Sequence, residues 1–244
     1  MKLLLVNGNT TQAVTDRVVA EATRCAAPGT TINGVTARFG VSIVSTEAEE
    51  EIARHAVLDA LAVSFAGHDA AILAISFDTA LLGARQIVPI AVVGVTEASL
   101  MTACLLGRRF GLISFGHSSR WMYLDLVQRA GLLQRMAGFE TIELTSSATY
   151  LREGGQDAAV IEASERLITV GADAVVVAGA AVAGIANRLR TQLSVPLLDG
   201  IACAVGQAET LVRLGLRPRA AIRPLTGGSA TIGIDPALSE LLSR

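Results

Sequence analysis

Two stretches of the sequence decide the fold: "DAAILAISFDT" at residues 69–79 and "DAVVVAGAAVAG" at residues 173–184. Each opens on an aspartate, continues as a short apolar run and ends in small or polar residues. Apolar runs of this length, bounded by turn residues, predict strands that are buried on both faces of a parallel sheet. Alignment of the two stretches pairs Ser76 with Ala180. Ser76 is then either a chemical group delivered to a site or an ordinary hydroxyl at a strand end.

Two further pairs of segments repeat in the same order along the chain. "LLLVNGNTT" (3–11) is similar to "GLISFGHSS" (111–119), and "VPIAVVGV" (88–95) is similar to "VPLLDGI" (195–201). Repeats this long indicate duplicated lobes rather than a solenoid. We therefore predict an α/β protein of two pseudo-symmetric lobes, each a mainly parallel sheet flanked by helices. The site of such a protein is expected in the cleft between the lobes, at the carboxyl ends of the strands.

Alternating apolar runs and amphipathic stretches give the expected elements. Strands are predicted at residues 3–6, 31–35, 70–75, 90–95, 110–114, 141–144, 174–178 and 196–198. Helices are predicted at residues 11–26, 46–66, 79–86, 99–106, 119–130, 157–170, 184–193 and 203–215. The first lobe is expected to comprise residues 1–98 and 196–244, and the second lobe residues 99–195. The tail after Leu216 is expected to wrap a lobe or a neighbouring subunit.

The composition narrows the class of protein. Hydrophobic residues make up 51% of the 244 residues and charged residues 17%, which is typical of a globular chain with a large core. A net charge of −2 gives no reason to expect a nucleic acid or a membrane as partner. Three cysteines without a CxxC pattern fit a reduced, cytoplasmic protein. The start, "MKLLLVNGNTT", has too short an apolar run for a signal peptide and is expected to form the first strand.

Two loops are expected to face the cleft. Asn7, Asn9 and Thr10 follow the first strand, and the run Gly116–His117–Ser118–Ser119 takes the equivalent place in the second lobe. Free backbone N–H groups at a helix start favour an anion, so the two loops are candidates for holding a small carboxylate, imide or amide. The alternative is that both loops only cap helices. His117 is the candidate acid, base or hydrogen-bond donor, and its alternative role is that of a solvated imidazole.

Other motifs are less specific. Glu97 and Asp199 each follow a strand, where a carboxylate either contacts a substrate or caps the next helix. Tyr123 follows the His117 loop, and we expect it mainly to pack against its lobe, while Phe77 is expected to add apolar wall to the site. The sequence contains no HExxH, CxxC, GxGxxG or Walker-type motif, so neither a metal nor a cofactor is predicted.

Five segments resemble the aspartate/glutamate/hydantoin racemase superfamily, and within it the hydantoin and allantoin racemase branch. They are "VNGNTT" (6–11), "SFDTALLGAR" (76–85), "VPIAVVGVTEAS" (88–99), "VVVAGAAVAGIA" (175–186) and "VPLLDGIACAV" (195–205). The resemblance runs in order from Met1 to about Leu216. It implies two pseudo-symmetric lobes with the substrate between them, no metal or organic cofactor, and frequent homo-oligomers. The family's usual Asn-Pro-Asn-Thr motif reads Asn-Gly-Asn-Thr here, with Gly8 in place of proline.

The resemblance also implies two catalytic cysteines, one per lobe, which move a proton off and onto the substrate's α-carbon. Ser76 stands where the first cysteine is expected, followed by Phe77, Asp78 and Thr79. The second is expected in a Gly-Cys-Ala-Gly motif, where Gly179, Ala180 and Ala181 stand. Both thiols are therefore missing at the two positions that the internal repeat pairs.

That departure changes the expected chemistry. A thiol is readily tuned into a base at neutral pH, an alcohol needs a partner base, and a methyl group transfers no proton.

Three hypotheses about function follow from the missing thiols. The first is a cofactor-independent enzyme that acts on a small carboxylate or a cyclic amide or ureide by hydrolysis, decarboxylation or lyase chemistry. The second is a racemase or isomerase that uses other residues, such as His117 and Glu97. The third is a non-catalytic protein that binds a small carboxylate or ureide.

Overall fold

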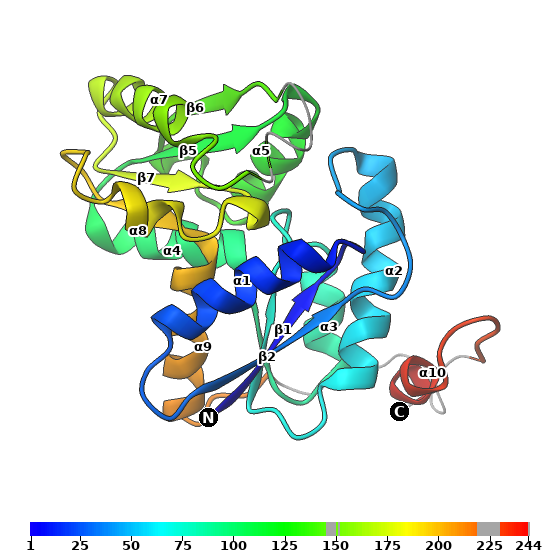
Figure 1. The fold of residues 1–244 in the computed structure, drawn as a ribbon. Helices are drawn as coiled ribbons and strands as arrows, with labels where there is room; N and C mark the ends of the chain where they lie inside the picture. The colour runs from blue at the N-terminus through cyan, green and yellow to red at the C-terminus, as the bar shows by residue number, and fades with distance from the viewer. Residues whose placement is uncertain (145–149, 151, 219–229, 244) are drawn as a thin grey trace.

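The chain forms two α/β lobes, one above the other in Figure 1, in a computed structural model that describes residues 1–144, 150, 152–218 and 230–243. The strands are β1 (Lys2–Asn7), β2 (Thr31–Thr36), β3 (Ala70–Leu73), β4 (Ala91–Gly94), β5 (Phe110–Phe115), β6 (Met136–Ile142), β7 (Ala174–Val177) and β8 (Leu197–Asp199). They form two four-stranded sheets with the orders β2-β1-β3-β4 and β6-β5-β7-β8. The matching orders confirm the duplicated α/β fold.

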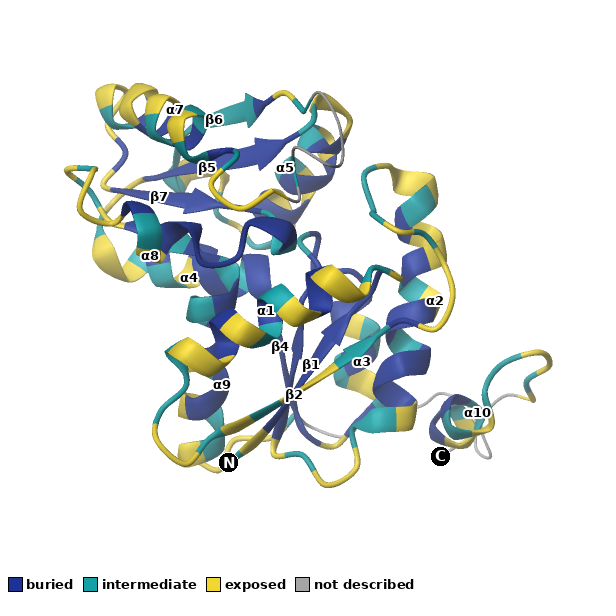
Figure 2. Ribbon diagram, in the orientation of Figure 1, coloured by how far each residue is buried: buried dark blue, intermediate teal, exposed yellow. Residues whose placement is uncertain are grey.

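All pairings within the two sheets are parallel, and the helices lie on both faces of each sheet. The described α-helices are α1 (Gln12–Cys25), α2 (Glu47–Ser64), α3 (Leu81–Ile87), α4 (Val95–Leu106), α5 (Arg120–Arg129), α7 (Asp157–Thr169), α8 (Ile185–Leu189), α9 (Gly200–Arg213) and α10 (Pro236–Ser243). Short 3-10 turns lie at η1 (His117–Ser119), η2 (Leu133–Arg135) and η3 (Ala180–Val182). Because both faces are covered, β3, β5 and β7 are buried throughout, as Figure 2 shows for β5 and β7.

The lobes exchange one helix each. Helix α4 follows β4 of the first sheet, yet Leu100 and Ala103 pack with Phe110 and Leu112 on the second sheet. Helix α9 follows β8 of the second sheet, yet its buried residues Ile201, Ala204, Val205 and Ala208 pack on the first sheet. In Figure 1, α9 accordingly lies in the lower lobe and α4 beside the upper sheet. The exchange means that neither core is complete without the other half of the chain.

The two exchanged helices approach closely where they begin. A Cβ added to Gly200, the first residue of α9, would lie 2.8 Å from both the Cβ and the carbonyl oxygen of Val95, the first residue of α4. Only glycine fits there without moving backbone, because the obstacle includes a carbonyl rather than a flexible side chain.

Several boundaries differ from the sequence-based expectations. Strand β6 begins at Met136 rather than at residue 141, because this edge strand is only partly buried and carries a weak apolar pattern. Strand β8 pairs with β7, so residues 197–199 belong to the second sheet, whereas the expected division placed them in the first lobe. The C-terminal helix α10 was not predicted. Its Leu238 and Leu241 are buried in the core shared with α2, so the tail packs on the first lobe.

We predict that Gly200→Ala destabilises the protein by about 1–3 kcal/mol, because the added methyl group forces the two helices apart. Chemical denaturation measures the free energy of unfolding. Gly206→Ala in the same helix is the matched control, because a Cβ there meets nothing within 4 Å. Its stability is expected to equal or exceed that of the wild type by up to about 1 kcal/mol. Equal effects of the two substitutions would contradict the account.

Candidate functional site

A cavity of about 370 Å³ lies where the strand ends of the two lobes meet. It is lined from the first lobe by Asn9, Val14, Ser42, Ile43, Val44, Ser45, Glu49, Ile75, Ser76 and Phe77, and from the second by Phe115, Ser119, Tyr123, Leu144, Tyr150, Ala180 and Ala181. The segment after β3 contributes Ser76, and the turn η3 after β7 contributes Ala180. The two positions that the repeat pairs therefore line the same cavity.

A hydrogen bond joins the two lobes inside this cavity. The Ala180 backbone N–H donates to the Ser76 hydroxyl oxygen over 2.8 Å. The neighbouring Thr96 hydroxyl donates to the Ser76 backbone carbonyl, which fixes that strand end from below the cavity. The serine is thus more than an ordinary strand-end hydroxyl, because its side chain spans the interface between the lobes.

Two tyrosines complete a group of hydroxyls. Tyr123 from α5 is almost fully buried, and its ring centroid lies 4.8 Å from that of Phe77. Burial raises the pKa of its phenol well above the ordinary value, although a hydrogen bond with the Ser76 hydroxyl acts in the opposite direction. Burial likewise raises the pKa of Tyr150, whose hydroxyl is hydrogen-bonded to the Ala181 backbone N–H. Both phenols therefore stay protonated at neutral pH and are poor bases.

The bend at Gly179 makes room for Tyr150. Gly179 has a φ of 144°, a conformation that L side chains rarely adopt, and a Cβ added there would lie 2.7 Å from the Tyr150 hydroxyl oxygen. The glycine therefore allows the phenol to approach the η3 turn, next to the position where the second cysteine of the family was expected.

The three thiols of the chain lie elsewhere. Cys25, Cys104 and Cys203 are free, and the lining of the cavity includes none of them. Burial raises the pKa of Cys25 to about 12, and burial also raises the pKa of Cys203 to about 11. Neither of these two thiols is disposed to form a thiolate at neutral pH.

The structure brings six of the predicted site residues to the cavity wall: Asn9, Ser76, Phe77, Ser119, Ala180 and Ala181. Asn9 is ordered by its neighbours, because its side-chain oxygen accepts from the Thr11 backbone N–H over 2.9 Å and from the Asn7 amide over 3.0 Å. The Ser119 hydroxyl donates back to the carbonyls of Phe115 and Gly116 in the preceding turn. A role for these residues in binding substrate stays a prediction.

Five other predicted residues lie outside the cavity lining. Asn7 is fully buried and supports Asn9 from behind, and the Thr79 hydroxyl donates to the Glu50 carboxylate over 3.3 Å. Thr10 and Ser118 are exposed, and Gly179 directly precedes the η3 turn. Asn7, Thr79 and Gly179 therefore shape the loops from which the lining residues project.

His117 also lies away from the cavity lining. Its side chain is 70% exposed, and Nε2 lies 2.8 Å from the Glu143 carboxylate. The two other carboxylates considered from the sequence are also engaged. Asp199 caps α9 by accepting from the Ala202 N–H over 3.1 Å, and Glu97 pairs with Arg85 at 2.5 Å. Of the two roles considered for Asp199, substrate contact or helix capping, the observed contact is helix capping.

Asp78 turns away from the cavity and caps α4 from outside the helix. Its carboxylate accepts from the backbone N–H groups of Thr96 at 3.0 Å and Glu97 at 2.6 Å, and its own backbone has a φ of 50°. Burial raises the pKa of Asp78 to about 7, and the two N–H donors offset this only in part. In this chain the side chain holds the exchanged helix rather than facing the cavity.

Sequence reasoning gave no site role to several lining residues. Tyr123 lies four residues after Ser119, so the helical spacing that places both on one face was a usable signal. Glu49 closes a capping box with Thr46, which predicts a helix start but not a cavity. Nothing in the sequence around Tyr150 pointed to the site.

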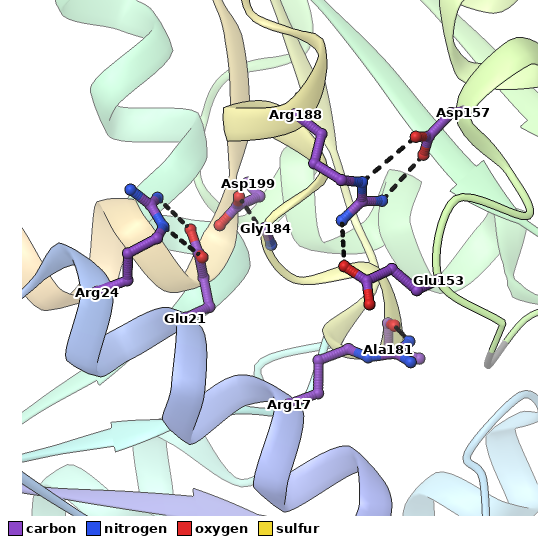
Figure 3. A network of polar contacts seen from close by, with 9 residues as sticks. All are labelled: Arg17, Glu21, Arg24, Glu153, Asp157, Ala181, Gly184, Arg188 and Asp199. Carbon is purple, nitrogen blue, oxygen red and sulfur yellow. Dashed lines mark hydrogen bonds and ion pairs between the residues drawn. The ribbon is translucent and has the colours of Figure 1, made fainter.

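A network of polar contacts anchors the η3 turn from its other side (Figure 3). Arg17 of α1 donates to the Ala181 carbonyl, which ties the turn to the first lobe. Arg188 pairs with Asp157 at 2.9 Å, and Asp199 accepts from the Gly184 N–H over 3.3 Å. Arg17, Gly184 and Arg188 border a second cavity of about 460 Å³ that shares Ala181 with the first. The turn that presents Ala180 is therefore held by both lobes.

Two features are absent from the described residues: a metal-binding cluster and a membrane-spanning helix. Among the described residues, no group of three or more His, Cys, Asp or Glu side chains is placed to hold a metal ion. Within the same part of the chain, every helix is too short or too polar to cross a membrane.

Comparisons with known proteins agree with this architecture. Residues 3–208 match the family described as Asp/Glu/Hydantoin racemase. The hydantoin racemase of Paenarthrobacter aurescens is 26% identical over 218 residues, which is 88% of this chain and 92% of that protein. The allantoin racemase from Klebsiella pneumoniae superposes with a TM-score of 0.90 at 28% identity, covering 98% of this chain and 99% of that one. The allantoin racemase from Pseudomonas fluorescens gives a TM-score of 0.81 at 30% identity, covering 96% and 100%.

We predict that Asp78→Asn changes stability in a pH-dependent way. Because the pKa of Asp78 in the folded protein, about 7, lies above the unfolded value of about 3.9, the folded state favours its proton. The contribution of Asp78 to stability is therefore complete below about pH 4 and is lost as the pH rises through 7. The melting temperature of the wild type should fall relative to the variant between pH 5 and pH 8.

Asp173→Asn is the matched control for this pH dependence. Asp173 also accepts from two backbone N–H groups, those of Arg108 and Arg109, but it is exposed and its pKa is lowered by these bonds. The difference in melting temperature between the wild type and the Asp173 variant should stay constant between pH 5 and pH 8. A constant difference for the Asp78 variant as well would show that burial does not perturb that carboxyl.

Proposed function

Because the chain belongs to the Asp/Glu/Hydantoin racemase family, we propose that it is a cofactor-independent enzyme that acts on a small cyclic amide or ureide, or a small carboxylate, without a catalytic thiol pair. The proposed reaction passes through a negatively charged oxygen on the substrate. Hydrolysis, decarboxylation and lyase chemistry at or next to a carbonyl group all share that feature.

The hydroxyl cluster at the lobe interface is the observation that carries this proposal. Ser76 lines the cavity from the first lobe, and Tyr123 and Tyr150 line it from the second. All three groups are neutral at physiological pH and donate hydrogen bonds rather than remove protons. Donors that are fixed in place before the reaction stabilise a developing oxyanion, and removal of one such donor typically costs about 10²–10³ in kcat.

The lining also argues against proton transfer by two thiols. Ala180 presents a methyl group where the family resemblance places one cysteine, and Ser76 presents an alcohol where it places the other. The Ser76 hydroxyl oxygen already accepts a hydrogen bond from the Ala180 N–H. The hydroxyl group can therefore act as a hydrogen-bond donor to another group. An alcohol without a neighbouring base does not become an alkoxide at neutral pH. The proposed role of Ser76 is therefore donation to the substrate oxygen.

A second candidate function is racemisation of a cyclic ureide by other groups. The observation in its favour is the similarity to hydantoin and allantoin racemases over nearly the whole chain. In that case the proton of the α-carbon would have to exchange through the cavity's hydroxyls or through Glu49, the single carboxylate among the described lining residues, because His117 and Glu97 are engaged outside the lining. Stereochemical and isotope measurements separate the two candidates.

We predict that Ser76→Ala and Tyr123→Phe each lower kcat by about 10²-fold or more and change KM much less, because each removes a donor used in the transition state. The assay follows chiral hydantoins, allantoin and substituted malonates in D2O, with NMR and polarimetry as readouts. The proposed chemistry consumes the substrate and forms a new compound. Racemisation instead labels the α-carbon with deuterium and abolishes optical rotation while the substrate persists.

Ser42→Ala is the control, because Ser42 lines the same cavity but is exposed and lies on the loop before α2. Its kcat should equal that of the wild type. Wild-type kcat in both the Ser76 and Tyr123 variants would remove the hydroxyl cluster from the mechanism. A ligand that raises the melting temperature without any turnover or exchange would identify the protein as a binder.

A further inference from the structure

We propose that Glu49 makes the cavity selective for uncharged ring compounds that carry N–H groups, and that it excludes compounds whose bound portion carries a carboxylate. The proposal rests on the proposed function above, and it chooses between the two substrate classes named there. Glu49 acts as a specificity determinant that contacts the ligand rather than as a residue that transfers protons.

The charge of the cavity wall is the first argument. Among the described residues that line the cavity, Glu49 is the only one with a charged side chain. The Arg17 guanidinium, which contacts the Ala181 carbonyl, lines the second cavity instead. The cavity therefore has one negative charge and no positive charge among its described lining residues.

The fixed position of the carboxylate is the second argument. The Oε2 atom of Glu49 accepts from the Ser45 N–H at 2.8 Å, the Ser45 hydroxyl at 2.9 Å and the Thr46 N–H at 2.9 Å. Partial burial raises the pKa of Glu49, but the hydrogen bonds from Ser45 and Thr46 together outweigh burial and leave that pKa below its ordinary value, so the group is ionised at neutral pH. These three bonds all use Oε2, so the helix start fixes that oxygen. The other oxygen, Oε1, is the proposed acceptor for a ligand.

The negative charge of the cavity wall and the fixed position of the Glu49 carboxylate affect the binding of carboxylates and of cyclic ureides differently. A carboxylate inside a cavity of about 370 Å³ lies within several ångströms of Glu49 and is repelled by it, and no described lining residue carries a compensating positive charge. A cyclic ureide is uncharged and carries N–H donors beside its carbonyl groups. Its N–H can donate to Oε1 of Glu49 while a carbonyl oxygen accepts from the Ser76–Tyr123 hydroxyl pair, in which one of the two protons is used in the bond between the hydroxyls. The cavity satisfies both kinds of polar group on such a ring.

The test compares two ligands that share one ring, 5-methylhydantoin and hydantoin-5-acetic acid, by isothermal titration calorimetry at pH 7.5. Wild-type protein should bind the uncharged ligand at least about tenfold more tightly. Raising the salt concentration from about 20 mM to 500 mM should narrow that preference, because salt screens the repulsion. Glu49→Gln should abolish most of the preference for 5-methylhydantoin, because the variant binds hydantoin-5-acetic acid more tightly than the wild type does.

Glutamine is a suitable replacement because a capping box accepts Gln as well as Glu, so the helix start is preserved. Circular dichroism checks that the variant is folded. Glu47→Gln is the matched control, since Glu47 lies in the first turn of the same helix but outside the lining of this cavity. That variant should keep the wild-type preference, so a general loss of negative charge is distinguished from the loss of Glu49.

Equal affinity of the wild type for the two ligands would overturn the proposal, and so would a preference that survives in Glu49→Gln. Failure of wild-type protein to bind either ring would also overturn it, because the cavity is then not a ureide site. Binding is measured without turnover. Absence of catalysis alongside the expected binding pattern would therefore contradict the proposed function and still support the role of Glu49.

Discussion

The close crossing of α4 and α9 is the constraint on which the rest of the molecule depends. Each helix begins at the end of a strand in one lobe and buries its apolar face in the other, and the two meet where Gly200 lies against Val95. This exchange holds the carboxyl ends of both sheets against each other. The cavity and the hydrogen bond from Ala180 to Ser76 follow from that arrangement.

The cavity offers hydrogen-bond donors to a substrate oxygen and one fixed acceptor to a substrate N–H. Its reactive groups are hydroxyls, and burial raises the pKa values of the two tyrosines among them. These groups therefore donate hydrogen bonds and do not abstract protons. Its single described charge, on Glu49, is negative and is fixed by three donors on one oxygen. A ligand that satisfies this wall offers a carbonyl oxygen to the hydroxyls and an N–H to the carboxylate. The same fold that holds a thiol pair in the expected family pattern thus supports a different distribution of donors and acceptors.

Much of the fold was predictable because it is repeated. The three pairs of similar segments located β1 and β5, β3 and β7, and β4 and β8, and they pointed to Ser76 and Ala180 before any coordinates. The site was less predictable, because it depends on side chains that reach it from other elements. Asp78 sits within the motif but caps α4, since its backbone turns at a φ of 50°. Tyr150 reaches the cavity from a segment without any periodic pattern, and helix α10 follows a stretch rich in turn residues.

The most direct test of the central claim is the activity of a variant that lacks all three cysteines, Cys25→Ala/Cys104→Ala/Cys203→Ala. None of these thiols lines the cavity, so the account predicts wild-type kcat and KM in the folded variant. Circular dichroism at the assay temperature establishes that the fold is intact. A folded variant whose kcat falls by orders of magnitude would show that a thiol performs the chemistry and would contradict the account.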